Sequence, residues 1–215
     1  MNLSTTYWSR LNTVNPDAKI ILRNLNLTSS QTSGTWNSYD VTFKCNVEME
    51  NVNLLKAVAF DGVDKTAVLK NVTIAESHDY YALWIAAAGQ TVSLENVTIN
   101  SLGRGIKIDD QYVEEDTKLV TLNVDGLKVK SVKKAAIMVK TPKGAHITLK
   151  DVDITEVKAD TSNEVWIDED ASSYINMVTV TGGSMIVEGQ ETVTINSMET
   201  LKSELAAAGE AGAGS

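Results

Sequence analysis

Residues 92–99 read Val92-Ser-Leu-Glu-Asn96-Val-Thr-Ile99, and this short pattern decides the fold. Side chains alternate between the two faces of a strand, so Val92 and Leu94 share one face. Val97 and Ile99 also share a face, but their positions have the opposite parity. Both pairs can be buried only if the chain bends between them, at Asn96, a residue type that tolerates unusual backbone angles. The pattern therefore predicts two short strands joined by a sharp bend.

The same pattern occurs in six segments, whose bend positions are separated by 27, 20, 25, 30 and 25 residues. Asparagine occupies the bend in four segments, and glycine and aspartate, which also suit a bend, occupy it in the other two. A fixed motif with variable spacing is typical of a solenoid whose loops differ in length. The bend residues are Asn24, Asn51, Asn71, Asn96, Gly126 and Asp151.

A further short apolar strand is predicted after the motifs, which gives three strands in each coil of the chain. Equivalent positions in successive coils would stack at the spacing of neighbouring strands, roughly 4.8 Å. The four asparagines are then expected to form an internal ladder, as asparagines do in stacked sheets. The additional strands are expected at 57–60, 82–85, 105–108, 136–139 and 164–167, with a seventh coil around 178–187.

These bend asparagines and their flanking apolar pairs resemble the pectate-lyase-like superfamily of right-handed parallel β-helices. The resemblance covers roughly residues 17–195 and implies an all-β solenoid of about six to seven coils. It says little about function, because this fold hosts lyases, hydrolases, adhesins and tailspikes. A leucine-rich repeat is the main alternative, but it would need closer spacing and more leucines.

The composition restricts the classes of partner. The chain has 215 residues, 43% of them hydrophobic, and a net charge of −9. This acidic balance argues against nonspecific binding of nucleic acid, which needs a basic face. No apolar run is long enough to span a membrane, and the first thirty residues do not resemble a signal peptide. The single cysteine, Cys45, cannot form an internal disulfide and is expected to be a small buried hydrophobe.

The two ends of the chain differ from the repeats. Residues 1–16 show no clear coil and are expected to cap the first one. Residues 196–215 are expected to form a short helix, with Met198, Leu201 and Leu205 at helical spacing, followed by a linker. This segment is either the start of a further domain, if the chain is cut from a larger protein, or a C-terminal cap.

The superfamily resemblance implies where a ligand would bind. Its carbohydrate-active members bind ligand along the strand that follows the asparagine motif, so the outward side chains of that strand are candidates. Trp84 and Trp166 would lie about 14 Å apart and suit sugar rings or cations. The alternative is that a loop containing 80–81 or 160–163 covers this stripe and buries it. The ligand-binding candidates are Trp84, Lys107, Met138 and Trp166, which follow Ala59 in the same outward column.

The next outward positions include aspartates that could serve an enzyme. Asp109 and Asp168 would stand on the order of 10 Å apart, near the carboxylate separation of an inverting glycosidase. Lys140 lies between them in the alignment, so the same residues also fit an ordinary surface charge ladder. The His and Arg signatures of superfamily hydrolases are missing, and Arg104-Gly-Ile-Lys107 is only a faint match. We therefore assign no catalytic residue.

No metal ligand or cofactor is expected. The acidic stretches at 109–110, 114–116 and 168–170 could hold Ca²⁺, but calcium-loop spacing is absent and solvated loops are the simpler interpretation. His78 and His146 fall in different coils without partner ligands. Asn71 and Asn96 lie in glycosylation sequons, but their place in an internal ladder argues against modification.

The sequence leaves three classes of function open. The favoured one is a noncatalytic module of a bacterial cell-surface or secreted protein, which acts as an adhesin, a glycan-binding domain or a spacer. It implies an extracellular or cell-surface location and a glycan or host protein as partner. A carbohydrate-active enzyme, either a polysaccharide lyase or a glycoside hydrolase, is the second class. The third is a self-assembling, tailspike-like protein, because open strand edges allow end-to-end or lateral association.

Overall fold

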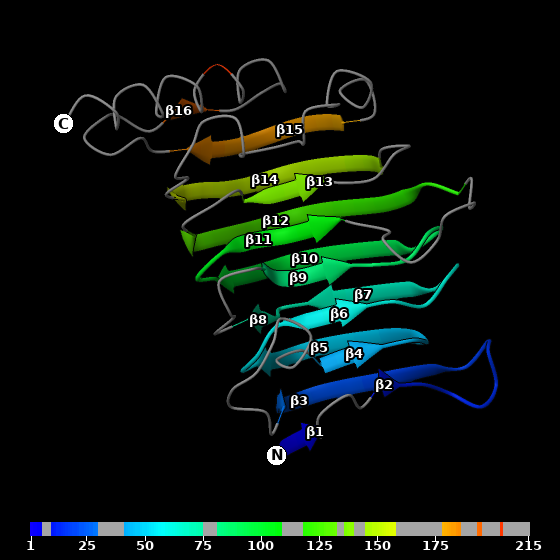
Figure 1. Ribbon diagram of the computed structural model, residues 1–215. Coiled ribbons are helices and arrows are strands. Elements are labelled where there is room, and N and C mark those ends of the chain that lie inside the picture. The colour runs from blue at the N-terminus through cyan, green and yellow to red at the C-terminus, as the bar shows by residue number, and fades with distance from the viewer. Residues whose placement is uncertain are drawn as a thin grey trace.

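In the computed structural model, the regular secondary structure of the described residues is almost entirely β-strand (Figure 1). It describes residues 1–5, 10–29, 41–74, 81–108, 118–132, 136–139, 145–157, 178–185, 193–194 and 203. Within these residues the all-β prediction is confirmed, and Ser203 is the one residue in a helix. Apart from Ser203, the helix expected within 196–215 lies outside the described residues, so its extent stays a prediction. No described helix is long and apolar enough to cross a membrane.

Ten of the described strands form one sheet, here called sheet A. Its order is β1-β3-β5-β7-β10-β12-β14-β15-β16, and β8 lies between β5 and β10. The bounds are β1 Asn2–Thr5, β3 Lys19–Ser29, β5 Asn46–Leu54, β7 Thr66–Lys70, β8 Thr73–Ile74, β10 Thr91–Asn100, β12 Val120–Val132, β14 Ala145–Val157, β15 Val178–Met185 and β16 Val193–Thr194.

Six shorter described strands form sheet B, in the order β13-β11-β9-β6-β4-β2. Four of them cover the predicted additional strands near 57–60, 82–85, 105–108 and 136–139, which are thereby confirmed. The fifth prediction, at 164–167, lies outside the described residues. The bounds are β2 Arg10–Leu11, β4 Val41–Phe43, β6 Val58–Phe60, β9 Tyr81–Ile85, β11 Arg104–Ile108 and β13 Ile137–Val139.

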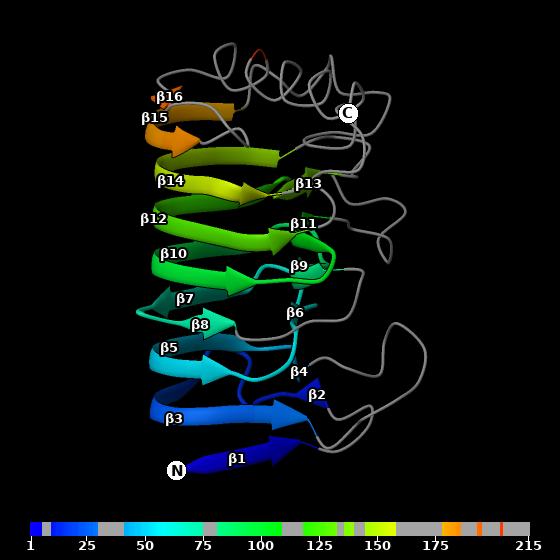
Figure 2. The same ribbon diagram turned by 90° about the vertical axis from the view of Figure 1, so that its left-hand side faces the viewer.

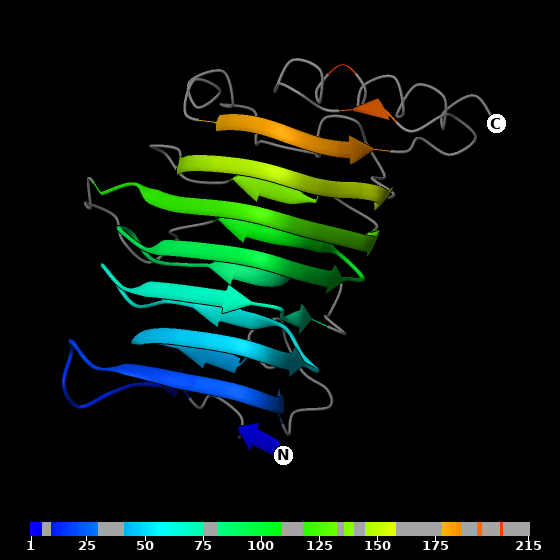
Figure 3. The same ribbon diagram turned by 180° about the vertical axis from the view of Figure 1, so that it is seen from behind.

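The chain alternates between the two sheets, and neighbouring strands are parallel except for β15 and β16. From β3 to β14, each passage through sheet A is followed by one through sheet B, and the next passage pairs with the strand one repeat earlier. The single antiparallel pair among the described strands is β15 with β16. Figure 3 shows the strands of sheet A stacked in chain order. Each repeat therefore pairs with the repeats before and after it.

The hydrophobic core lies between the inward faces of the two sheets. Along β10 the burial alternates up to the bend, where it changes phase as the parity of Val92, Leu94, Val97 and Ile99 requires. These side chains stack on equivalents in the neighbouring strands, and Phe43 of β4 packs on Phe60 of β6 with ring centroids 6.0 Å apart. The core is thus a set of apolar columns running along the stack.

The predicted bends are confirmed by the backbone. The asparagines at the bend have φ angles of 53°, 53°, 51° and 53°, and Asp151 also has a φ of 53°. Gly126, at the equivalent position, has a φ of 81°. This left-handed conformation reverses the parity of the side chains, so that both flanking apolar pairs face the core. Figure 2 shows the strands of sheet A folding around this edge of the molecule.

Residues 1–16, expected to cap the stack without a clear repeat, contribute a strand to each sheet. β1 pairs with the second half of β3, from Asn26 to Ser29, and β2 pairs with β4. Two- to four-residue strands carry no periodicity of their own, which is why the sequence did not indicate them.

Candidate functional site

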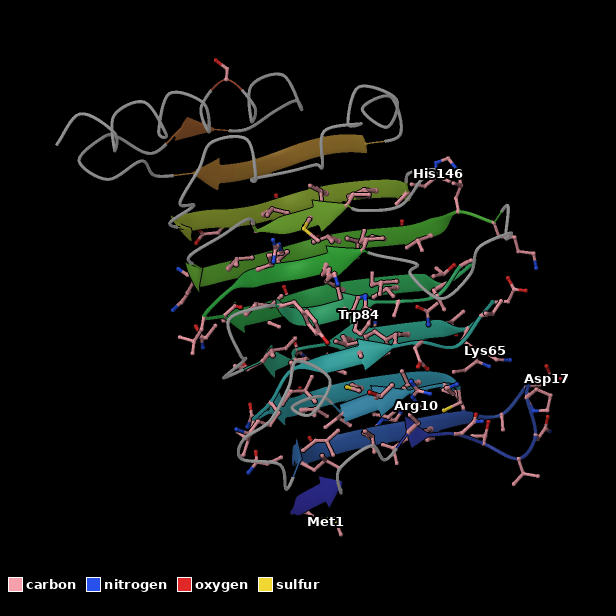
Figure 4. The ribbon with its side chains drawn as sticks, in the orientation of Figure 1. Met1, Arg10, Asp17, Lys65, Trp84 and His146 are labelled. Carbon is pink, nitrogen blue, oxygen red and sulfur yellow. The ribbon has the colours of Figure 1, made fainter. Side chains whose placement is uncertain are left out.

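The outward side chains of sheet B form the predicted column. The strand register places Thr42, Ala59, Trp84, Lys107 and Met138 side by side, one from each of β4, β6, β9, β11 and β13. Figure 4 labels Trp84 near the middle of this sheet. Trp166 lies outside the described residues. The structure therefore brings together three of the four predicted ligand-binding residues.

These side chains form a packed aromatic and cationic cluster. The rings of Tyr81 and Trp84 lie 5.3 Å apart at an angle of 52°. The Lys107 ammonium nitrogen lies 4.7 Å from the Trp84 ring centroid and 5.7 Å from that of Tyr81, within the range of a cation–π interaction. Tyr81 and Trp84 belong to a second apolar cluster, separate from the main core, which also contains Ala57, Ala59 and Ala86.

Trp84 and Lys107 are covered, as the covered-stripe alternative expects. Trp84 is only 5% exposed and Lys107 only 7%, and Met138 is half-buried. Tyr81 contributes to this burial, because its ring packs against Trp84 and the Lys107 ammonium lies over both rings. Strand alternation indicates that a side chain leaves the core, but it does not indicate whether another part of the chain covers it. The covered-stripe alternative therefore describes this site better.

Beside the cluster lies an ion pair between Arg10 and Asp61. Nε of Arg10 is 3.3 Å from Oδ2 of Asp61, which follows β6 on the same face as Ala59. The other carboxylate oxygen, Oδ1, is buried and has no hydrogen-bond partner among the described residues. Burial raises the pKa of Asp61 above its ordinary value, while Arg10 and Lys44 act in the opposite direction. Arg10 was missed in the sequence because β2 has only two residues and no pattern.

The predicted acid pair cannot be built from the described residues, since Asp109, Lys140 and Asp168 all lie outside them. The acidic stretches considered for Ca²⁺ and the residue His78 also lie outside. In the part of the chain that the structure describes, no three His, Cys, Asp or Glu side chains come together as metal ligands would. Cys45 is buried as predicted, and burial raises the pKa of its thiol.

The asparagines at the bend are joined by side-chain hydrogen bonds. Nδ2 of Asn51 donates to Oδ1 of Asn24 at 3.1 Å, Asn71 donates to Asn51 at 3.2 Å, and Asn96 donates to Asn71 at 3.5 Å. The expectation that this ladder is internal is wrong, because all four residues are exposed. At a left-handed corner the flanking apolar side chains turn inward, and the bend residue keeps its side chain outside the core. The argument from burial against glycosylation of Asn71 and Asn96 therefore fails.

A column of charges runs beside the asparagines, at the position just before the bend. Its ion pairs join neighbouring strands: Arg23 to Glu50 at 3.0 Å, Lys70 to Glu95 at 2.7 Å, and Lys150 to Asp125 at 2.8 Å. A shift of register between the two strands of any of these pairs would separate the opposite charges. The column does not alternate throughout, because Glu95 and Asp125 lie side by side. The three ion pairs therefore favour the observed register at three of the strand pairs of sheet A, in addition to the packing of the core.

Comparisons of the chain with protein-family models, curated proteins and solved structures found no match.

Proposed function

We propose that the chain is a noncatalytic, right-handed parallel β-helix module that serves as a spacer in a secreted or cell-surface protein. The observation that supports this most strongly is the parallel pairing of successive strands of sheet A from β3 to β15, in which the β12–β14 pair shifts register between Lys128 and Val132. When each repeat pairs only with its neighbours, every added repeat lengthens the stack by one strand spacing. Hydrogen bonds between neighbouring strands then connect the repeats along the whole stack. Such an arrangement suits a spacer domain, which keeps the segments at its two ends a fixed distance apart.

The structural support for the β-helix itself comes from the alternation between two parallel sheets and from the column at the bend. From β3 to β14, each pass through sheet A turns at a left-handed residue, and the side-chain amides of the four asparagines among these residues are linked along the stack. These are the features by which the sequence resembles the pectate-lyase-like superfamily, over roughly residues 17–195. The number of coils, six to seven, belongs to this proposal.

The covered stripe favours a spacer over a glycan-binding domain. A tryptophan that binds a sugar must present its ring face, whereas the Trp84 ring lies against Tyr81 and beneath the Lys107 ammonium. Breaking this cluster to admit a ligand would expose two aromatic rings and separate the cation from them. We infer that Trp84 and Lys107 stabilise the outer face of sheet B.

The test is the Trp84→Ala variant, with Thr98→Ala on the outer face of sheet A as a matched control. If Trp84 is structural, its variant should lose about 3–5 kcal/mol of unfolding free energy, as large aromatic truncations in packed sites do. The control should melt almost as the unmodified protein does. Denaturant unfolding followed by circular dichroism measures both.

A panel of pectin, xylan and host glycans, with and without calcium, completes the test. We expect no cleavage, and no binding that depends on Trp84. The spacer proposal fails if Trp84→Ala retains the full stability and loses binding to a glycan that the unmodified protein holds. Cleavage that is abolished by Asp109→Asn or Asp168→Asn would instead establish the enzyme.

A further inference from the structure

Two of the four bend asparagines stand in glycosylation sequons, which the spacer role does not use. The segments Asn71-Val-Thr-Ile74 and Asn96-Val-Thr-Ile99 are identical in sequence. An N-linked glycan is attached to asparagine followed two residues later by serine or threonine, at the protein surface. Both asparagines are exposed, and Thr73 and Thr98 are half-buried and lie side by side in the strand register. The structure therefore presents two candidate acceptors with the same local sequence.

The neighbours of these two asparagines differ. Asn71 lies between two other amides, because it donates to Asn51 at 3.2 Å and accepts from Asn96 at 3.5 Å. Asn96 has an asparagine on one side only, since the next repeat has Gly126 at the bend. A β-carbon at Gly126 would lie 2.8 Å from Oδ1 of Asn96, so the absence of that side chain leaves room beside the Asn96 amide. A bulky glycan needs such room, because neighbouring bends are only about 4.8 Å apart.

The amide of Asn96 can carry a substituent and still take part in the ladder. A primary amide has two N–H groups, and one of them donates to Asn71. Oδ1 of Asn96 lies on the Gly126 side, opposite to Asn71, so the N–H that donates is the one anti to the carbonyl. A secondary amide strongly prefers the trans form, which keeps this anti N–H and places the substituent on the other position. The hydrogen bond to Asn71 can therefore persist when the second N–H is replaced.

We propose that Asn96 is an acceptor site for N-linked carbohydrate and is modified in preference to Asn71. The donor is a sugar whose anomeric carbon carries a diphosphate leaving group, attached either to a lipid or to a nucleoside. A bond forms between Nδ2 of Asn96 and the anomeric carbon, while the bond from that carbon to the phosphate oxygen breaks. The diphosphate leaves with the electron pair, and the amide loses one proton. The step needs neither an oxidant nor a reductant.

This site goes beyond the spacer role and does not depend on it. A glycan at Asn96 would project from the edge around which sheet A folds, away from the covered cluster on the outer face of sheet B (Figure 2). Its attachment is tested on the purified chain. A negative result would therefore leave the predictions for Trp84 unchanged, and a failure of those predictions would leave this site unchanged.

The test offers the purified full chain to two transferases in separate arms, and mass spectrometry of the digested product identifies the modified asparagines. One arm uses an oligosaccharyltransferase with a lipid-linked oligosaccharide, and the other uses a soluble N-glycosyltransferase with a nucleoside diphosphate hexose. A short peptide with a sequon shows that each enzyme is active. We expect sugar on Asn96, with less on Asn71, and the productive arm identifies the donor.

Two variants separate the sequon from its surroundings. Thr98→Ala removes the hydroxyl of the sequon and leaves the Asn96 amide in place, so the modification of Asn96 should be lost. Gly126→Asn puts a side chain into the free space beside Asn96 and keeps a residue type that tolerates the left-handed bend. The sugar on Asn96 should then fall to the level on Asn71, which should not change.

Three results would each overturn the proposal. The first is an unmodified Asn96 in both arms while the peptide is glycosylated. The second is equal modification of Asn71 and Asn96, which would show that the surroundings of the sequon do not matter. The third is a level on Asn96 that a folded Gly126→Asn variant leaves unchanged. If that variant does not fold, the comparison of Asn71 with Asn96 in the unmodified chain decides alone.

Discussion

The asparagine at the bend meets two demands at once. Its backbone is left-handed, which costs other non-glycine residues roughly 1–2 kcal/mol, and its amide both donates and accepts along the stack. Glycine satisfies only the first demand. At Gly126 a β-carbon would lie 2.8 Å from Oδ1 of Asn96, so this position ends the amide ladder. Whether asparagine or glycine fits at a bend therefore depends on the space left by the neighbouring repeat as well as on the left-handed backbone.

The two demands can be separated at Asn71, which is hydrogen-bonded on both sides. Asn71→Leu should lose the hydrogen bonds and add left-handed strain, whereas Asn71→Gly should lose only the hydrogen bonds. We expect the leucine variant to be less stable than the glycine variant by about 1–2 kcal/mol, as measured by denaturant unfolding. Equal stabilities would show that the backbone angle at Asn71 carries no cost.

Asp61 and Glu48 should respond to pH in opposite directions. Burial raises the pKa of Asp61, so its contribution to stability is present below its ordinary pKa of 3.8 and is lost as the pH rises through the raised value. Lys19 and Arg23 lower the pKa of Glu48, so its contribution is present above its ordinary 4.5 and is lost as the pH falls through the lowered value.

Thermal melts between about pH 3 and pH 7 compare the two groups. Relative to the unmodified protein, Asp61→Asn should become more stable as the pH rises, and Glu48→Gln should become less stable. Subtracting the unmodified protein removes the titration of groups common to all three chains. If the two differences change with pH in the same direction, one of the assigned environments is incorrect.

At the scale of single elements, the spacing between β11 and the segment leading into β13 depends on the absence of a side chain at Gly105. Gly105 lies in β11, and a β-carbon there would meet the carbonyl oxygen of Ala136 at 2.4 Å. That carbonyl accepts the hydrogen bond from the backbone N–H of Ile106 at 2.8 Å. Any side chain at Gly105 therefore pushes against the hydrogen bond that joins β11 to the segment leading into β13.

Gly105→Ala should consequently destabilise the protein by about 1–3 kcal/mol, the usual range for overpacking. Ser93→Ala, on the outer face of β10, is the control and should have little effect. Hydrogen exchange would locate the damage, because the amide of Ile106 should lose protection before those of sheet A. Unchanged protection at Ile106 would contradict the assigned contact.

The sequence predicted the elements better than their surroundings. Parity at the bend located the strands of sheet A, and the short apolar segments after the motifs located the sheet B strands with the column containing Trp84, because alternation and spacing are properties of the local chain. The sequence offered both an exposed and a covered Trp84, with 80–81 as a covering segment, but could not decide between them, since the contact with Tyr81 forms only in the folded chain. Nor could it give the Arg10–Asp61 pair, which joins residues distant in the sequence through a strand of two residues.

The whole molecule is a stack in which the same contacts recur. Apolar columns run inside, and amide and charge columns run along the outside of sheet A. The amide column joins the four repeats from Asn24 to Asn96, and the ion pairs join three pairs of neighbouring strands, so these contacts favour the observed register. The net charge of −9 is spread over a surface where many acidic groups already have basic partners. This organisation is consistent with the proposed spacer domain, in which the length and stiffness of the stack would be the useful properties.

The central claim is that the repeats stack strand on strand at a constant spacing, and distances along one column test it most directly. In the Cys45→Ala background, spin labels at Asn53 and Asp153 are separated by four strand spacings, about 19 Å. Labels at Asn53 and Thr98 are separated by two spacings, about 10 Å. Dipolar EPR should give a single narrow distribution for each pair, differing by about two strand spacings. Broad distributions, or equal distances for the two pairs, would contradict the stacked arrangement.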